Sequence, residues 1–344
     1  MLNASRIKEK ALELGFHLVG ITPAVRYPEA DYYARWLERG FAGAMGYMNW
    51  NIVKREDPRL LFPPARSVIV CGLSYYRSGA DSLARDFTTG YISRYARGDD
   101  YHTVLKSKLF ALVNFIQQES GAFVEAKVCV DTVPLLERVH GYYAGLGWIG
   151  KHGGLINEKY GSWFFLGEIL LNRELEYDTP VPDRCGKCRR CLDACPTGAI
   201  VEPRLLDARR CLSYLTIEHR GIIPEEFRGL MGNRVFGCDR CQSVCPWNQH
   251  AVPTDEEALF PRAHLIAPDL LWLGTLTPHE FSKVFHKSPV KRAKFSGLLR
   301  NTVIAMGNSR HSAYIPLLEQ LADTTDAVVH AHIPWALGEV GREV

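Results

Sequence analysis

The chain has 344 residues, of which 47% are hydrophobic and 23% are charged, and its formal net charge is +3. This composition is ordinary for a soluble globular protein, and the length allows two or three domains. No apolar run approaches the roughly 18 residues that span a bilayer, and the start lacks the apolar core of a signal peptide. We therefore expect a cytoplasmic protein without membrane contact, in which clustered cysteines stay reduced and bind metal.

Residues 1–180 are predicted to alternate between helix and strand. In chain order we expect a helix over residues 7–15, a strand over 17–21, a helix over 31–40, a strand over 67–73, a helix over 101–120, a strand over 123–130, a helix over 135–145 and a strand over 163–171. Pro134 suits the first position of the helix at 135–145. The strand at 67–73 has no polar alternation, which is typical of a strand buried on both faces. This alternation predicts an α/β layered domain.

Residues 181–255 hold eight of the ten cysteines, namely a spaced run of four and a spaced run of three, each closed by Cys-Pro, with Cys211 alone between them. The first has the spacing of bacterial [4Fe–4S] ferredoxins, in which three cysteines bind one cluster and the fourth binds the other. Two sets of ligands follow, namely Cys185, Cys188, Cys191 and Cys245 for one cluster, and Cys195, Cys211, Cys238 and Cys241 for the second. The alternatives are a disulfide scaffold or a zinc ribbon, but zinc sites use four isolated ligands. The sequence thus predicts a ferredoxin-like domain that transfers single electrons, with Cys71 and Cys129 left as inert core residues.

Residues 275–344 are predicted to be helical. Residues 298–308 and 328–338 share an apolar pattern that ends in glycine, and they start 30 residues apart. That spacing suits a helical solenoid repeat, although two copies are fewer than such an array normally needs. The alternative is a tail that packs on the preceding domain.

A basic block overlaps the start of this helical region. Residues 281–318 contain no acidic residue and seven basic ones, namely Lys283, Lys287, Lys291, Arg292, Lys294, Arg300 and Arg310. A block of one sign predicts either a phosphate-binding face or a solvated helix surface.

The polar segment at 131–138, Asp-Thr-Val-Pro-Leu-Leu-Glu-Arg, contains the candidate catalytic acid. Asp131 ends a predicted strand and precedes a predicted helix, where open α/β sheets place their ligands. It can donate a proton at neutral pH only if burial raises its pKa. The alternative role for Asp131 is that of a helix N-cap. Residues 95–102, Tyr-Ala-Arg-Gly-Asp-Asp-Tyr-His, form a polar, aromatic-rich segment that is either a wall of the substrate site or a solvent loop.

Together with the cysteine spacing, the segments 55–59 (Arg-Glu-Asp-Pro-Arg), 130–138 and 147–151 (Gly-Trp-Ile-Gly-Lys) and the repeat-like tail give the chain a resemblance to epoxyqueuosine reductases. The chain is more distantly similar to reductive dehalogenases, which normally carry an export signal that is absent here. The resemblance implies reduction of the epoxide of epoxyqueuosine at the wobble position of tRNA. It also implies a nitroreductase-like domain over 1–180, a ferredoxin-like domain over 181–255 and a HEAT-like helical region over 275–344.

The same resemblance implies the cofactors, site and partners. Two [4Fe–4S] clusters would reduce a base-off cobalamin, and the absence of an Asp-x-His-x-x-Gly loop fits the base-off mode. Asp131 would donate the proton, and the cobalamin contacts would be Arg55, Asp131, Leu155, Ser213, Arg220 and Asp239. One departure is His152-Gly153-Gly154 after Lys151, where an asparagine-threonine type of sequence is expected. The implied partners of this monomer are the tRNA anticodon arm and an external low-potential donor such as a flavodoxin or ferredoxin. The alternatives are a dehalogenase-like enzyme and an electron-transfer or RNA-binding module without substrate chemistry.

Overall fold

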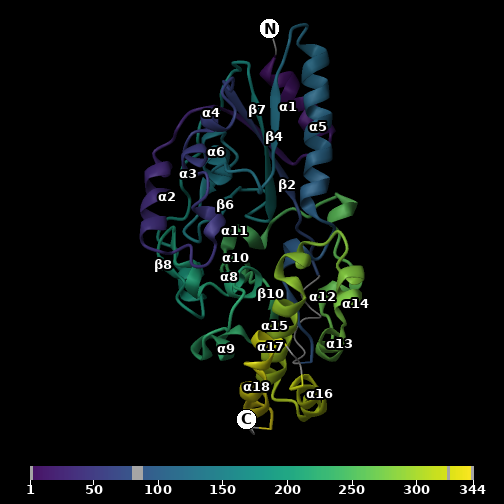
Figure 1. Cartoon of the computed structure of the whole chain (residues 1–344). Helices are drawn as coiled ribbons and strands as arrows, with labels where there is room; N and C mark the ends of the chain where they lie inside the picture. The colour runs from purple at the N-terminus through teal and green to yellow at the C-terminus, as the bar shows by residue number, and fades with distance from the viewer. Residues whose placement is uncertain (1–2, 80–87, 324–325, 342–344) are drawn as a thin grey trace.

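The computed structural model describes residues 3–79, 88–323 and 326–341. The outer bounds predicted for the first and last domains, residues 1 and 344, lie outside these ranges. The molecule is elongated, with a sheet domain at one end, the cysteine-rich segment in the middle and the C-terminal helices at the other end (Figure 1). Within the described ranges, no helix is long and apolar enough to cross a bilayer.

A four-stranded sheet organises the first domain. Its order is β1 (Leu18–Pro23), β2 (Ser67–Ser74), β7 (Phe164–Leu171) and β4 (Ala126–Cys129), and every neighbouring pair is antiparallel. The strands predicted at 17–21, 67–73 and 163–171 are confirmed, whereas β4 is shorter than the strand predicted at 123–130. Because the sheet is antiparallel, the ligand-placement rule of parallel sheets does not apply to Asp131.

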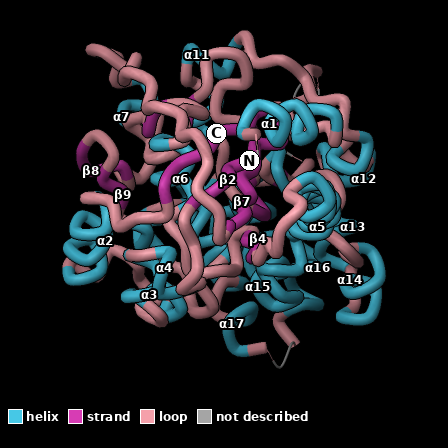
Figure 2. Tube along the Cα trace, turned by 90° about the horizontal axis from the view of Figure 1, so that it is seen from above, coloured by secondary structure: helices cyan, strands magenta, loops and turns pink. Residues whose placement is uncertain are grey.

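Helices cover both faces of this sheet, as Figure 2 shows from above. Ile69 and Leu73 of β2 pack with α1 (Ala4–Glu13) and α5 (Tyr101–Glu119), while Val68 and Val70 face the core beside α6 (Glu137–Tyr143). Successive side chains of a strand point to opposite faces, so a strand covered on both sides needs apolar residues throughout. All eight residues of β2 are buried, which confirms the predicted layered domain.

Short elements complete the sheet domain. They are α2 (Glu29–Glu38), α3 (Ile52–Glu56), α4 (Pro58–Leu61), β5 (Trp148–Ile149) and β6 (Leu155–Ile156).

The cysteine-rich segment is built from short helices and hairpins. In chain order they are α7 (Arg190–Asp193), β8 (Ile200–Glu202), β9 (Leu205–Leu206), α8 (Leu212–Ile217), α9 (Glu225–Met231), β10 (Arg234–Phe236), α10 (Arg240–Ser243) and α11 (Pro246–Gln249). Strand β10 pairs in parallel with β3 (Tyr91–Ile92), and this pairing ties the segment to the N-terminal part of the chain.

The C-terminal helices surround one buried helix, α15 (Lys294–Ser309). The others are α12 (Ala263–Ile266), α13 (Leu270–Thr275), α14 (Pro278–Val284), α16 (Ile315–Leu321), α17 (Ala327–His330) and α18 (Ile333–Glu339). The two similar segments of the sequence pack on each other as α15 and α18, and a Cβ atom at Gly307 would lie 2.9 Å from Ala336 Cα. The same core contains Val235 and Phe236 of β10, so the tail packs on the preceding domain.

Candidate active site and cluster-binding loops

Asp131 lies in the turn between β4 and α6. Its φ of +49° places it in the left-handed region, which is uncommon for residues other than glycine. Helix α6 begins only at Glu137, and its N-cap is Leu136, which makes no side-chain capping bond. The helix starts later than predicted because residues 131–135 form tight turns, with the Leu135 N–H donating to the Val133 carbonyl at 2.8 Å. The N-cap hypothesis for Asp131 is therefore wrong.

Two residues at the start of α5 contact the Asp131 carboxylate. The Tyr101 hydroxyl donates to Asp131 Oδ2 at 2.8 Å, and His102 Nε2 lies 3.3 Å from the same oxygen. The Tyr101 ring stacks on Phe165 of β7 with ring centroids 4.1 Å apart, which fixes the start of α5 against the sheet. His102 Nδ1 lies 2.7 Å from Oδ1 of Asp100, the N-cap of α5. Residues 95–102 thus reach the predicted catalytic acid, and the solvent-loop alternative is wrong.

The pKa of Asp131 is lowered, whereas a proton donor was expected to have a raised one. Burial alone would raise the pKa of Asp131, but hydrogen bonds from His102 and Tyr101 and the positive charges of His102 and Arg292 bring it below its usual value. The side chain remains 57% exposed, which limits the effect of burial. Burial lowers the pKa of His102, but the carboxylates of Asp100 and Asp131 together raise it to about 9. At neutral pH the proton therefore resides on His102, and Asp131 is a carboxylate.

Two further carboxyl groups lie beneath this turn. Glu137 accepts a hydrogen bond from the Asp131 backbone N–H, and burial followed by the charge of Asp131 raises the pKa of Glu137 to about 8. Glu168 of β7 is fully buried, and no described residue hydrogen-bonds to either of its carboxyl oxygens. Burial, then Glu137 and Asp131, raise the pKa of Glu168 well above its usual value. Both groups therefore favour the neutral form, because close carboxyl groups oppose one another's ionisation.

The predicted cobalamin contacts lie in different settings. Arg55 Nε is buried without a partner among the described residues, and its guanidinium lies 5.7 Å from the Tyr33 ring centroid. Leu155 of β6 packs in the core beside α6 and pairs with Ile149 of β5.

The other three predicted contacts lie around the cysteine-rich segment. Ser213 is half-buried in α8. Arg220 donates to the carbonyl oxygens of Ala293 at 2.8 Å and Arg292 at 2.6 Å, which fastens its loop to the C-terminal helices. Asp239 is 5% exposed, and its Oδ2 accepts bonds from the Tyr91 hydroxyl at 2.7 Å and the Arg94 N–H at 2.8 Å. None of these contacts involves a cofactor, so the six predicted cobalamin contacts stay predictions.

The eight clustered cysteines lie near one another in two groups. Burial raises the pKa of Cys245, and the charges of Cys185 and Cys188 raise it further. Burial likewise raises the pKa of Cys241, with added effects from Cys195, Cys211 and Cys238. These interactions run within each expected set of four, and the assignment of ligands to each cluster stays a prediction. Among the described residues, no group of three or more metal-binding side chains is placed to hold a metal ion.

The two remaining cysteines are confirmed as core residues. Cys71 and Cys129 are both 0% exposed, and burial raises the pKa of each thiol. A buried thiol of this kind is inert.

Two residues that support the first cysteine loop were missed in the sequence. Lys151 Nζ donates to the carbonyl oxygens of Gly186 at 2.6 Å and Cys188 at 2.8 Å. Trp148 is 1% exposed and packs in one small cluster with Cys245 and Cys185. The run Gly-Trp-Ile-Gly-Lys contains both residues, but only the fold shows that they hold the cysteine loop.

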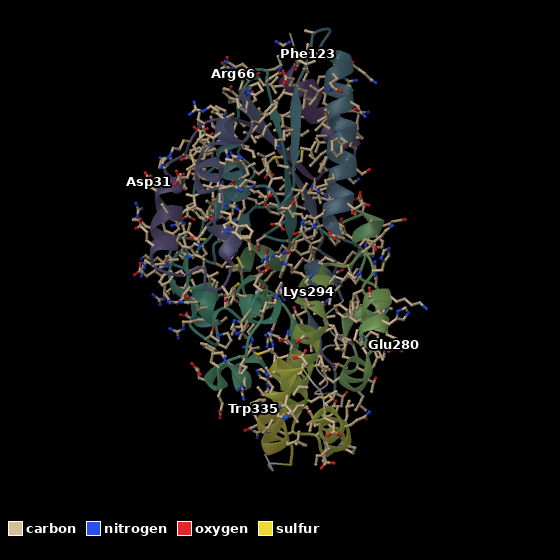
Figure 3. The ribbon with its side chains drawn as sticks, in the orientation of Figure 1. Asp31, Arg66, Phe123, Glu280, Lys294 and Trp335 are labelled. Atoms are coloured by element: carbon tan, nitrogen blue, oxygen red, sulfur yellow. The ribbon has the colours of Figure 1, made fainter. Side chains whose placement is uncertain are left out.

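The basic block is only partly a surface. Arg300 is fully buried and donates to the carbonyl oxygens of Leu215, His219 and Gly221, each at 2.8 Å. Arg292 Nε pairs with Glu218 Oε1 at 2.9 Å. Lys294 is exposed midway along the molecule (Figure 3). Arg300 therefore cannot belong to a phosphate-binding face.

Comparisons with known proteins agree over nearly the whole chain. Residues 55–132 match the family model described as epoxyqueuosine reductase QueG, DUF1730, and residues 184–248 match a 4Fe-4S double cluster binding domain. The epoxyqueuosine reductase of Salmonella typhimurium is 43% identical over 338 residues, which cover 98% of this chain and 88% of the relative.

Solved structures agree as well. An epoxyqueuosine reductase bound to an epoxyqueuosine-modified tRNA stem loop has a TM-score of 0.91 and 32% identity, covering 98% of this chain and 90% of that one. The enzyme from Bacillus subtilis with its catalytic loop swung out of the active site has a TM-score of 0.90 and 31% identity, with the same coverage. A reductive dehalogenase reaches a TM-score of only 0.46 at 16% identity, covering 90% of this chain and 37% of that one, which is too weak to inform function. The chain belongs to the epoxyqueuosine reductase family of oxidoreductases.

Proposed function

We propose that this chain reduces the epoxide of epoxyqueuosine at the wobble position of a tRNA anticodon arm. The observation that carries the proposal is the Asp131 site, where a carboxylate, a charged imidazole and a phenol meet on one surface. The family relation and the stem loop bound by a solved relative support this substrate. Opening an epoxide to an alkene consumes two electrons and two protons and releases water, so the site must supply protons to an oxygen.

The proposed electron path uses two [4Fe–4S] clusters. The sets are Cys185, Cys188, Cys191 and Cys245, and Cys195, Cys211, Cys238 and Cys241, all within the matched double cluster domain. We also propose an external flavodoxin or ferredoxin as donor, a monomeric enzyme, and the finer labels nitroreductase-like for residues 1–180 and HEAT-like for 275–344.

The proposed base-off cobalamin would accept hydrogen bonds from two buried donors, on His152 and Arg55, that have no partner among the described residues. His152 Nδ1 accepts the Gly154 N–H at 3.0 Å, so the neutral ring carries its proton on Nε2, which is buried and unpartnered among the described residues. Burial lowers the pKa of His152 to about 4, which keeps it neutral. His152 Nε2 and Arg55 Nε are donors of the kind that the amide groups of a corrin would satisfy. The bound cobalamin would supply the electron pair that removes the epoxide oxygen.

The residues of the chain bind and orient the substrate and supply its protons. Tyr101 and Glu137 hold Asp131 from two sides, through its carboxylate and its backbone N–H. Asp131 donates protons to the departing oxygen. The residues proposed to line the cofactor are Leu155, Ser213, Arg220 and Asp239. The swung-out loop of the Bacillus subtilis enzyme suggests that the turn carrying Asp131 also moves here.

The test is conversion of an epoxyqueuosine-containing stem loop by anaerobically reconstituted protein with cobalamin and a chemical reductant. We expect queuosine, identified by mass spectrometry after nuclease digestion, and no product when cobalamin is omitted. Intact clusters and tight RNA binding without queuosine would favour the electron-transfer or RNA-binding alternative. Turnover of a halogenated aromatic substrate alone would favour the dehalogenase alternative.

A further inference from the structure

The proposed reaction needs two protons in each turnover, and the Asp131 carboxyl can hold only one at a time. At neutral pH this carboxyl is ionised in the structure, so even the first proton must come from a neighbour. The group that supplies it must lie within reach of Asp131 and must itself connect to solvent.

His102 meets both requirements. Its Nε2 is buried and lies 3.3 Å from Asp131 Oδ2. Its other ring nitrogen, Nδ1, lies 2.7 Å from Oδ1 of Asp100. The Asp100 side chain is 33% exposed, so a carboxylate, an imidazole and a second carboxylate form a chain from solvent to the predicted active site.

The charges around His102 come from several elements and favour its protonated form. Asp100 caps the same helix and Asp131 approaches from the β4–α6 turn, whereas Glu137 at the start of α6 has a raised pKa and favours its neutral form. The positive charge of Lys106 lowers the pKa of Asp100, and that of Arg292 lowers the pKa of Asp131. Both cations therefore act on the carboxylates that contact His102. The two nearest groups are both carboxylates, and an opposite charge this close keeps an imidazole charged.

We propose that His102 is a proton relay that recharges Asp131 twice in each turnover. In each transfer the Nε2 proton of the imidazolium moves to Asp131 Oδ2, and Asp131 passes it to the oxygen of the substrate. The first proton converts the opened epoxide oxygen to a hydroxyl group, and the second lets it leave as water. After each transfer the ring keeps its Nδ1 proton beside the Asp100 carboxylate, and one solvent proton returns to Nε2 to restore the imidazolium. The two electrons come from the external donor of the proposed function. His102 acts through Asp131 and does not touch the substrate.

The test combines chemical rescue with a pH profile in the reconstituted enzyme. His102→Gln retains a hydrogen-bonding side chain but cannot carry a proton at neutral pH, so we expect turnover to fall at least about tenfold. Added imidazole should restore the rate in proportion to its concentration. The parent should lose activity as the pH rises through about 9, because the folded imidazolium then loses its proton, and the variant should lack this limb.

Tyr101→Phe is the matched control, because it removes the other hydrogen bond to Asp131 without removing a titrating group. We expect its loss of turnover to be insensitive to imidazole. A His102→Gln enzyme with parental turnover, or one whose lost turnover does not respond to imidazole, would show a structural role for His102.

A second measurement does not depend on turnover. Hydrogen–deuterium exchange at the carbon between the ring nitrogens, followed by mass spectrometry in the holoenzyme, gives the pKa of each histidine. His102 should titrate near 9 in the parent and clearly lower in Asp131→Asn. An unchanged value would overturn the relay, whereas failure of the parent to form queuosine while His102 titrates as expected would refute only the proposed substrate.

Discussion

Replacing Arg300 by methionine tests whether this arginine is part of the core or part of an RNA-binding face. Methionine fills a similar volume but donates no hydrogen bond. The change leaves the carbonyl oxygens of Leu215, His219 and Gly221 without these donors, as well as Oδ1 of Asn301. An unsatisfied buried acceptor costs about 1–3 kcal/mol, and relief of the buried guanidinium offsets part of the total. We expect a loss of roughly 3–5 kcal/mol in the free energy of unfolding.

The assay is urea denaturation of anaerobically reconstituted protein, followed by far-ultraviolet circular dichroism. A loss of this size lowers the urea midpoint by roughly 1–2 M, because slopes grow with chain size and reach about 3 kcal/mol per molar for larger proteins. Lys294→Met is the matched control, since Lys294 is exposed on the same helix. A midpoint for Arg300→Met within experimental error of this control would refute the structural role. A changed salt dependence of RNA binding without loss of stability would place Arg300 on the RNA face after all.

Four further outcomes follow from the site. Reconstituted protein should hold about eight iron atoms and Cys195→Ser about four, by elemental analysis, and a parent value near four would contradict two clusters. Asp131→Asn should keep its iron but lose about 10²–10⁴-fold in turnover, and near-parental turnover would remove Asp131 from the mechanism. Replacing Lys291 and Lys294 by alanine should reduce the salt slope of stem-loop binding by about 0.7–0.9 per contact, whereas an unchanged slope would make this a solvated face. Glu168→Gln should match the parent in melting temperature near pH 4 and exceed it increasingly as the pH rises above 4.5, because the unfolded carboxyl then ionises while burial keeps the folded one protonated; equal melting temperatures at pH 7 would refute the raised pKa.

The cysteine groups could be predicted from spacing because ligand chemistry is local in sequence. The buried strand β2 could be predicted for a similar reason, since a strand covered on both faces must be apolar throughout. The direction of the strands could not be predicted this way. Neither apolar periodicity nor turn residues distinguish a parallel from an antiparallel neighbour, and the argument that placed Asp131 at the edge of a parallel sheet was wrong.

The site itself depends on contacts between distant parts of the chain. Tyr101 and His102 could be recognised as candidates, but their contact with Asp131 requires α5 to lie across the sheet. The role of Arg300 was hidden because charge alone does not distinguish a buried arginine from an exposed one. A signal was present nonetheless, since Arg300 stands between Leu298-Leu299 and the apolar run that begins at Val303. Glu168 in the apolar strand β7 carried the same signal.

The ionised state of Asp131 and the need for a proton donor are reconciled by what covers the site during catalysis. The Asp131 side chain is 57% exposed in the free protein, where solvent stabilises the ion pair with His102. A nucleotide and a corrin above it would exclude that water, and loss of solvation disfavours both charges of the pair. Transfer of one proton from His102 to Asp131 converts the ion pair into two neutral groups, so covering the site itself drives the transfer. Asp131 would therefore become the acid when the substrate is in place, and it would remain a carboxylate when the site is open.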